Sequence, residues 1–290
     1  MVDPTTAPTA AAPTTAAPTT AGPTTAADPR GAMHHVRRGA GPPLLLLHGL
    51  GGSWRSWSTV LGPLTAEREV IVPDLPGFGH TPPLAGEVSI ATLADAVTAF
   101  LDARGLRGVD AVGSSMGARL VLELARRGVV GATVSLDPGG FWQGWEQVFF
   151  YDTVASSYHL VRALQPVMPA LTGSAVGRAA LFAQFSARPW AVPADVALVE
   201  MRSFAAGPSF IPLLRSLVHG PAQQGAPAGA TPGPITVGWG RHDRVCLPRQ
   251  AERAMARFPG ARLYWFERSG HFPQWDSPDE TVRLILDSTG

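Results

Sequence analysis

The sequence predicts an α/β fold, in which a mostly parallel, doubly wound sheet carries a helical insertion. Short apolar segments of strand length alternate with helical patterns over most of the chain, which is typical of βαβ units. Turn residues such as His48-Gly49 and Pro73-Asp74 follow the apolar segments directly. One long stretch, residues 139–230, shows helical periodicity without strands and holds about half of the aromatic residues.

Each expected element has a local reason. The run of leucines before His48 is uninterrupted, as in a parallel strand that is buried on both faces. Gly105 and Gly128 end helical patterns, because glycine is favoured just past a helix C-terminus. The expected strands are Leu44–Leu47, Glu69–Val72, Val109–Val112, Ala132–Leu136, Ile235–Trp239 and Arg262–Phe266. The expected helices are Trp54–Ala66, Ser89–Arg104, Met116–Arg127, Pro248–Arg257 and Ser277–Asp287.

The chain divides into three parts. Residues 1–33 are rich in Pro, Thr and Ala, with prolines at 8, 13, 18 and 23, and such low-complexity sequence predicts a disordered tail. Residues 34–138 and 231–290 are expected to form the α/β core. Residues 139–230 are expected to form a helical cap that covers one end of the sheet.

Composition excludes several classes of function. The formal net charge of +1 gives no basis for binding nucleic acid or an anionic membrane. All 23 basic residues are arginine, which excludes Schiff-base chemistry on lysine. Cys246, the sole cysteine, allows no intrachain disulfide and no cysteine-based metal site, and is expected to be a buried packing residue.

The chain shows neither a secretory signal nor an apolar run of about 18 residues, so we expect a cytoplasmic protein.

The strongest local motif is Gly113-Ser114-Ser115-Met116-Gly117, which lies between an expected strand and an expected helix. A serine on so sharp a turn needs small neighbours, because strand and helix approach each other closely there. The turn also places the hydroxyl at a helix N-terminus, where the partial positive charge favours a developing oxyanion. Ser115 is therefore the candidate nucleophile.

A serine nucleophile requires a base, and the base requires a group that orients it. Asp243 and His271 follow two consecutive expected strands. Loops at the carboxyl ends of parallel strands converge on one crevice, so Ser115, Asp243 and His271 are expected to meet there. His271 is the candidate base and Asp243 the candidate acid. Asp137 also follows an expected strand and is an alternative acid.

Together these motifs resemble those of the α/β-hydrolase superfamily in its capped form, from about residue 34 to the C-terminus. The resemblance rests on His48-Gly49-Leu50-Gly51-Gly52, Asp74-Leu75-Pro76-Gly77-Phe78-Gly79, the Ser115 turn and the loops of Asp243 and His271. It implies that the backbone amides of Leu50 and Met116 form an oxyanion hole. The family begins with two antiparallel strands, whereas only residues 34–38 precede the first motif here. One edge strand is therefore expected to be missing or irregular.

Other polar residues are assigned structural roles. His48 is expected to hold the oxyanion loop by hydrogen bonds, and the glycines around Asp74 are expected to serve tight turns. No metal site is expected, because the remaining histidines form no His-x-x-x-His pair and no cluster with carboxylates. No cofactor is implied either.

The expected reaction is acyl transfer to water. Ser115 attacks an ester, thioester or lactone of a small apolar or aromatic substrate, and His271 takes the hydroxyl proton. The insertion supplies aromatic candidates for lining the pocket: Phe141, Trp142, Trp145, Phe149, Phe150 and Trp190.

Other functions remain open. A C–C bond hydrolase and a cofactor-free non-hydrolytic enzyme would both use the same three residues. From other classes, a small-ligand-binding protein on a hydrolase scaffold needs no turnover, and a scaffold that acts through its N-terminal tail does not depend on Ser115. A small molecule is the only partner that the sequence implies, and the oligomeric state is not predicted.

Overall fold

A computed structural model describes Met1 and residues 33–290, and within them seven strands form one sheet in the order β1-β3-β2-β4-β5-β6-β7. The first strand is antiparallel to β3, and every other neighbouring pair is parallel. The strands are β1 (His35–Arg38), β2 (Pro43–Leu47), β3 (Glu69–Pro73), β4 (Asp110–Ser114), β5 (Thr133–Leu136), β6 (Ile235–Gly240) and β7 (Arg262–Phe266). The mostly parallel sheet confirms the predicted fold class. The predicted tail lies outside the described residues, apart from Met1 and Met33.

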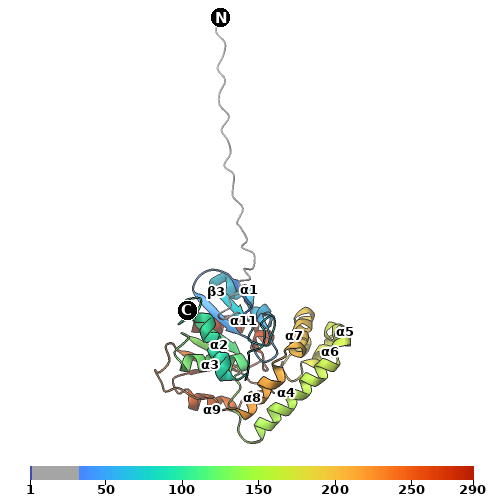
Figure 1. Cartoon of the computed structure of the whole chain (residues 1–290). Helices are drawn as coiled ribbons and strands as arrows, with labels where there is room; N and C mark the ends of the chain where they lie inside the picture. The colour runs from blue at the N-terminus through green and yellow to red at the C-terminus, as the bar shows by residue number, and fades with distance from the viewer. Residues whose placement is uncertain (2–32) are drawn as a thin grey trace.

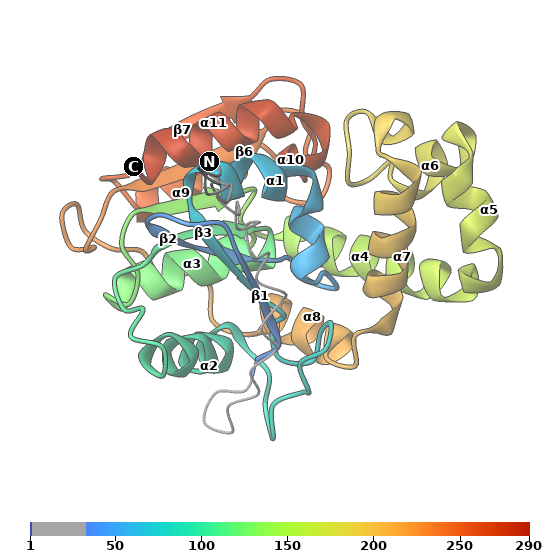
Figure 2. The ribbon, with the colours of Figure 1, turned by 90° about the horizontal axis from the view of Figure 1, so that it is seen from above.

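Helices cover both faces of the sheet (Figure 2). One face packs against α1 (Ser58–Glu67) and α11 (Pro278–Ser288), whose apolar residues share a core cluster with β2, β3 and β4. The other face packs against α2 (Ile90–Asp102), α3 (Met116–Arg126) and α9 (Gln250–Arg257). This arrangement buries the strands on both sides, which explains their uninterrupted apolar runs.

Between β5 and β6 the chain is helical, and these helices lie together at one side of the sheet (Figure 1). They are α4 (Trp145–Ala163), α5 (Met168–Gly173), α6 (Ala175–Leu181), α7 (Ala194–Ala206) and α8 (Phe210–His219). Their aromatic residues pack against one another, as in the stacked pair Tyr158 and Phe210, whose ring centroids are 4.3 Å apart. Buried Glu146 ties α4 to the core through ion pairs with Arg249 and Arg253. The limits of the cap, 139 and 230, stay a prediction.

The structure differs from the expected elements at three places. The expected helix Trp54–Ala66 begins as a 3-10 turn, Trp54–Trp57, because Ser53 and Ser56 form a reciprocal cap before α1. A short helix, α10 (Pro273–Asp276), follows His271 and was not expected. The third difference is β1, an antiparallel edge strand that was not among the expected strands; the expected loss of a further edge strand concerns residues outside the described part of the chain and stays a prediction.

Among the described residues, none of the helices combines the length and the apolar content that crossing a membrane requires. The cellular location stays a prediction.

Candidate active site

Ser115 lies on the turn between β4 and α3, in a backbone conformation that few residues other than glycine adopt. Its φ of 57° is in the left-handed region, and the flanking glycines are required by close approach. A Cβ on Gly113 would lie 2.1 Å from the carbonyl oxygen of Gly117, and one on Gly117 would lie 2.2 Å from that of Leu47. The Ser115 amide also donates to Leu136 of β5 at 2.9 Å. The hydroxyl is thereby held at the carboxyl edge of the sheet.

The structure brings Ser115, His271 and Asp243 together. His271 follows β7, and its Nε2 lies 2.7 Å from Oγ of Ser115. Its Nδ1 lies 2.8 Å from Oδ2 of Asp243, which follows β6. The three side chains are buried, Ser115 being 8% and His271 1% exposed. In this arrangement Nε2 can accept the hydroxyl proton while the carboxylate holds Nδ1 protonated.

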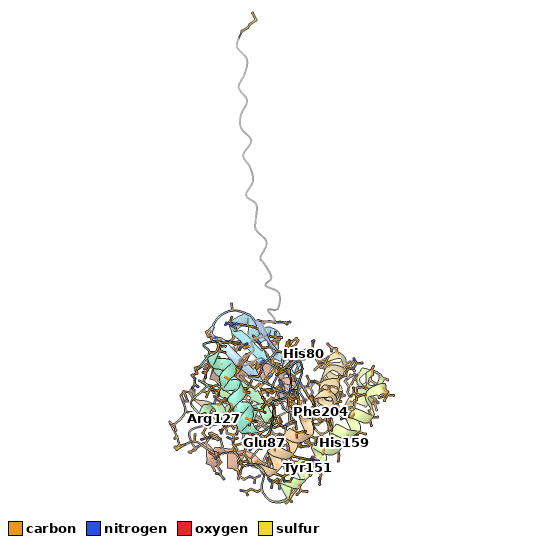
Figure 3. All side chains as sticks on the ribbon, viewed as in Figure 1. His80, Glu87, Arg127, Tyr151, His159 and Phe204 are labelled. Carbon is orange, nitrogen blue, oxygen red and sulfur yellow. The ribbon has the colours of Figure 1, made fainter. Side chains whose placement is uncertain are left out.

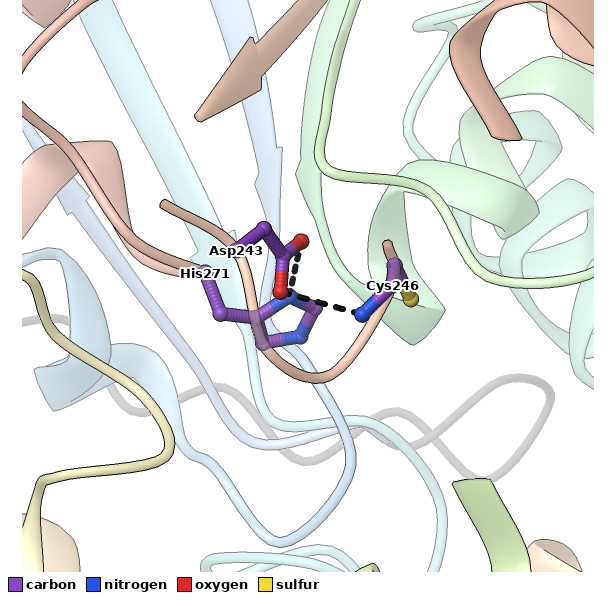
Figure 4. Close-up of side chains that lie close together, drawn as sticks. All are labelled: Asp243, Cys246 and His271. Carbon is purple, nitrogen blue, oxygen red and sulfur yellow. Dashed lines mark hydrogen bonds and ion pairs between the residues drawn. The ribbon is translucent and has the colours of Figure 1, made fainter. Parts of the chain in front are cut away.

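The carboxylate of Asp243 is fixed by its own loop. Its Oδ1 accepts hydrogen bonds from the amides of Val245 and Cys246, at 2.7 and 3.0 Å. Cys246, Asp243 and His271 form a compact group of potential metal ligands, in which the ligand atoms lie within 4.8 Å of one another (Figure 4). Both carboxylate oxygens already accept hydrogen bonds, and burial raises the pKa of the Cys246 thiol well above its usual range. This donor set is therefore suited to orienting a histidine and not to holding a cation.

Asp137, the alternative acid, does not bond to His271. It is fully buried at the end of β5, and its Oδ1 accepts from the amide of Gly240 at 2.8 Å. Burial, and after it the neighbouring Asp243 carboxylate, raise the pKa of Asp137 well above its usual range. Since the carboxylate that reaches Nδ1 of His271 is that of Asp243, the geometry favours Asp243 as the acid.

The loop after β2 lies directly beside Ser115. A Cβ on Gly49 would be only 3.2 Å from Cβ of Ser115. Among the described residues, no acceptor is found for the backbone amide of Leu50 or for that of Met116, the first residue of α3. Both amides are therefore free to bind an oxyanion.

His48 fixes the oxyanion loop from behind. Its Nδ1 donates to the carbonyl of Gly49 at 2.8 Å, and its Nε2 accepts from the amide of Leu75 at 2.9 Å. Burial lowers the pKa of His48, so the ring is neutral, as this pattern of bonds requires. His48 thus has the structural role expected from the sequence.

Asp74 organises a second loop near the site. Its buried carboxylate accepts from the amides of Trp54 and His80, at 2.7 and 3.0 Å, and contacts Nδ1 of His34 at 2.8 Å. Of the histidines labelled in Figure 3, His80 lies beside this loop and His159 is on α4. Neither hydrogen-bonds Ser115, and both oxygens of the Asp74 carboxylate are engaged by residues of its own loop and its neighbours, which agrees with the structural role expected for this loop.

A small cavity of about 30 Å³ borders the oxyanion loop. Its aromatic walls are Phe185, Phe204, Phe272 and Trp275, none of which the sequence singled out. The six aromatic candidates from the sequence lie elsewhere: Phe141 and Phe150 are buried in the core, for example, and Trp145 and Trp190 are 59% and 55% exposed. Phe272 follows His271 directly, which is the one sequence signal that could have identified it.

Comparisons with known proteins agree with this fold. A model of the family described as "Alpha/beta hydrolase family" matches residues 44–284. A 2-hydroxymuconate semialdehyde hydrolase of Pseudomonas putida is 30% identical, over 86% of this chain and 87% of that protein. A 2-hydroxy-6-oxo-6-phenylhexa-2,4-dienoate hydrolase of Burkholderia cepacia is 26% identical, over 88% of this chain and 90% of that protein.

Among solved structures, a thermophilic esterase from Thermogutta terrifontis superposes with a TM-score of 0.69 at 20% identity, covering 88% of this chain and 92% of that one. The structural similarity shows the fold alone. The family match, which spans most of the chain, shows more: this protein belongs to the alpha/beta hydrolase family and is a hydrolase.

Proposed function

We propose that the protein is a serine hydrolase that cleaves an ester, thioester or lactone of a small apolar or aromatic substrate through an acyl-enzyme on Ser115. One observation carries the proposal. The Nε2 of His271 lies 2.7 Å from the Ser115 hydroxyl while its Nδ1 lies 2.8 Å from Asp243. A nucleophile, a base and a group that orients the base thus form one continuous hydrogen-bonded line.

In the first half-reaction, Oγ of Ser115 attacks the carbonyl carbon, and His271 Nε2 takes the hydroxyl proton. The amides of Leu50 and Met116 hold the resulting oxyanion, and the N-terminus of α3 adds a favourable field. The imidazolium of His271, stabilised by Asp243, then protonates the leaving alcohol or thiol as the carbon–heteroatom bond breaks.

In the second half-reaction, water attacks the acyl-enzyme and gives a proton to His271 Nε2. The tetrahedral intermediate collapses, the bond to Ser115 breaks, and His271 returns the proton to Oγ. The carboxylic acid leaves. These steps balance with water as the only co-substrate, and no cofactor is needed.

Hydrolysis of a C–C bond is the second candidate, because two relatives named above are hydrolases of dienoate and semialdehyde compounds. Such chemistry uses the same three residues, so the geometry of the triad does not separate it from ester hydrolysis. A cofactor-free non-hydrolytic reaction and a small-ligand-binding role remain alternatives on the same scaffold.

The test is a panel of p-nitrophenyl esters from acetate to decanoate, assayed with the wild type and Ser115→Ala. The proposal expects turnover by the wild type and a loss of at least about a thousandfold in the variant. A 2-hydroxy-6-oxo-dienoate is assayed in parallel. Cleavage of the dienoate alone selects C–C hydrolysis, and equal activity of wild type and variant on esters overturns the proposed role of Ser115.

A further inference from the structure

The cavity beside the oxyanion loop contains polar groups that the proposed mechanism does not use. Gly49 and Leu50 form one side of it, and Phe272, which follows His271, forms another. Helix α7 of the insertion closes it with Glu200 and Phe204. The cavity therefore lies where the acyl part of a substrate would meet both the oxyanion loop and the insertion.

Glu200 is a buried carboxyl in this cavity, with only 6% of its surface exposed. Its Oε2 accepts a hydrogen bond from Oγ of Ser56 at 3.0 Å, but its Oε1 has no hydrogen-bond partner among the described residues. Burial raises the pKa of Glu200 to about 7, and no charged side chain offsets this effect. A buried carboxyl oxygen without a partner destabilises a fold, so its presence in a cavity indicates a site for a ligand group.

Two further buried polar atoms belong to residues that line the same cavity. The indole Nε1 of Trp275 is a donor and the amide Oε1 of Gln274 an acceptor, and neither finds a partner within residues 33–290. Gln274 is held in place because its Nε2 donates to Oγ of Ser114 at 3.1 Å. The cavity thus offers a carboxyl, a fixed acceptor and a fixed donor.

These groups select for one kind of ligand atom. Of the described residues that line the cavity, none is an arginine or a histidine, so a carboxylate or phosphate would find no cation there and would face Glu200. An ammonium can only donate and would leave the indole of Trp275 unpaired. A hydroxyl both donates and accepts, so it can satisfy Glu200 or Gln274 together with Trp275.

We propose that this cavity is a hydroxyl-binding subsite, formed by Glu200, Gln274 and Trp275, and that the preferred substrates are uncharged esters or lactones with a hydroxyl close to the scissile carbonyl. The rest of the wall is apolar and includes Met201 and Phe204, and the volume of about 30 Å³ admits the hydroxyl of a substrate whose remaining atoms lie outside the cavity. This inference rests on the proposed function, whose site it extends. It also distinguishes the chain from an enzyme for dienoates, whose carboxylate would find no counter-charge in this cavity.

The first experiment measures binding without turnover. Ligand-observed NMR with Ser115→Ala protein compares ethyl 3-hydroxybutanoate, ethyl 2-hydroxybutanoate, ethyl butanoate and monoethyl succinate. The subsite predicts that one hydroxy ester binds at least about tenfold more tightly than ethyl butanoate, and that the anionic succinate ester binds weakest. In protein-observed NMR spectra, the subsite also predicts that the hydroxy ester shifts the indole N–H resonance that is missing from Trp275→Phe.

Three variants, each combined with Ser115→Ala, assign the effect to Glu200. Glu200→Leu is expected to remove the preference for the hydroxy ester while leaving ethyl butanoate binding within about twofold. Glu200→Gln keeps an acceptor for Ser56 and is expected to retain part of the preference. This conservative variant provides the comparison if Glu200→Leu fails to fold. Asp195→Asn, an exposed acid on the same helix, should change neither ligand's affinity.

The outcomes separate this inference from the proposed function. Equal binding of hydroxy and plain esters, or equal weakening of both by Glu200→Leu and Glu200→Gln, overturns the subsite whatever the wild type hydrolyses. A hydroxyl preference that depends on Glu200, in a protein whose wild type cleaves no ester, supports the subsite and rejects only the ester chemistry.

Discussion

The Nε2 atom of His271 lies 2.7 Å from Oγ of Ser115, although 156 residues separate the two along the chain. The contact arises because β4 and β7 are parallel strands of one sheet, so the loops that follow them emerge at the same edge. Asp243, from the loop after β6, completes the arrangement at Nδ1. The short distance between Ser115 and His271 is therefore a consequence of the sheet topology.

Amide substitution of the two buried acids, Asp243 and Asp137, is expected to lower activity to very different extents. Asp243→Asn replaces the acceptor of His271 Nδ1–H, so we expect the rate constant for ester hydrolysis to fall by about ten-thousandfold. Asp137→Asn keeps the acceptor for the Gly240 amide and leaves the hydrogen bond between His271 and Asp243 in place, so its loss should stay below about tenfold. Steady-state kcat of both variants gives the comparison. A larger loss of kcat in Asp137→Asn than in Asp243→Asn would identify Asp137 as the acid.

Gly117, two residues after the nucleophile, is expected to tolerate no side chain. In Gly117→Ala the new Cβ would lie 2.2 Å from the carbonyl oxygen of Leu47, a backbone atom that cannot rotate away. We expect a loss of unfolding free energy of about 1–3 kcal/mol, with a displaced Ser115 and reduced kcat.

Gly62→Ala is the matched control for this substitution. It lies in α1, where the new Cβ meets nothing within 4 Å, and should be neutral or stabilise the fold by up to about 1 kcal/mol. Urea denaturation measures both variants. Equal unfolding free energies for Gly117→Ala and Gly62→Ala would contradict the close contact at the turn, because they would mean that a Cβ fits beside Leu47.

Glu200 is expected to make the unfolding free energy depend on pH. The pKa of its carboxyl is about 7 in the folded protein, against an ordinary value of 4.5 in the unfolded chain. Below pH 4.5 both states are protonated and there is no penalty. As the pH rises towards 7 the unfolded state ionises first, so stability falls, by up to about 3 kcal/mol above pH 7.

Glu200→Gln removes this penalty. Its unfolding free energy, relative to that of the wild type, should therefore rise between about pH 4 and pH 8 by up to the same 3 kcal/mol. Glu87→Gln, at an exposed position, should show a constant difference over that range. Denaturation curves across the range provide the measurement, and parallel curves for wild type and Glu200→Gln would contradict the raised pKa.

Much of the sheet could be predicted, because parallel strands leave long apolar runs such as the leucines of β2. Residues at strand ends, such as Ser115 and His271, could be placed together for the same reason, since the topology fixes which edge they share. The choice between Asp137 and Asp243 was harder, because both follow strands and only the orientation of His271 separates them.

The cavity could not be predicted in this way. Glu200 and Phe204 reach the oxyanion loop only because α7 packs against the turn Trp54–Trp57, a tertiary contact that helical periodicity does not encode. The residue type of an aromatic side chain in the insertion does not tell whether it packs between helices, as Phe150 does, or lines the cavity, as Phe204 does. Composition alone therefore pointed to aromatic residues that do not line this cavity.

The most direct test of the central claim is covalent labelling with a fluorophosphonate, followed by intact mass and peptide mapping. The account predicts one phosphonyl group per chain, attached to Ser115, with labelling abolished in Ser115→Ala and slowed by at least about a thousandfold in His271→Ala. Attachment to the neighbouring Ser114, or equal labelling of wild type and Ser115→Ala, would contradict the assignment of Ser115 as the nucleophile.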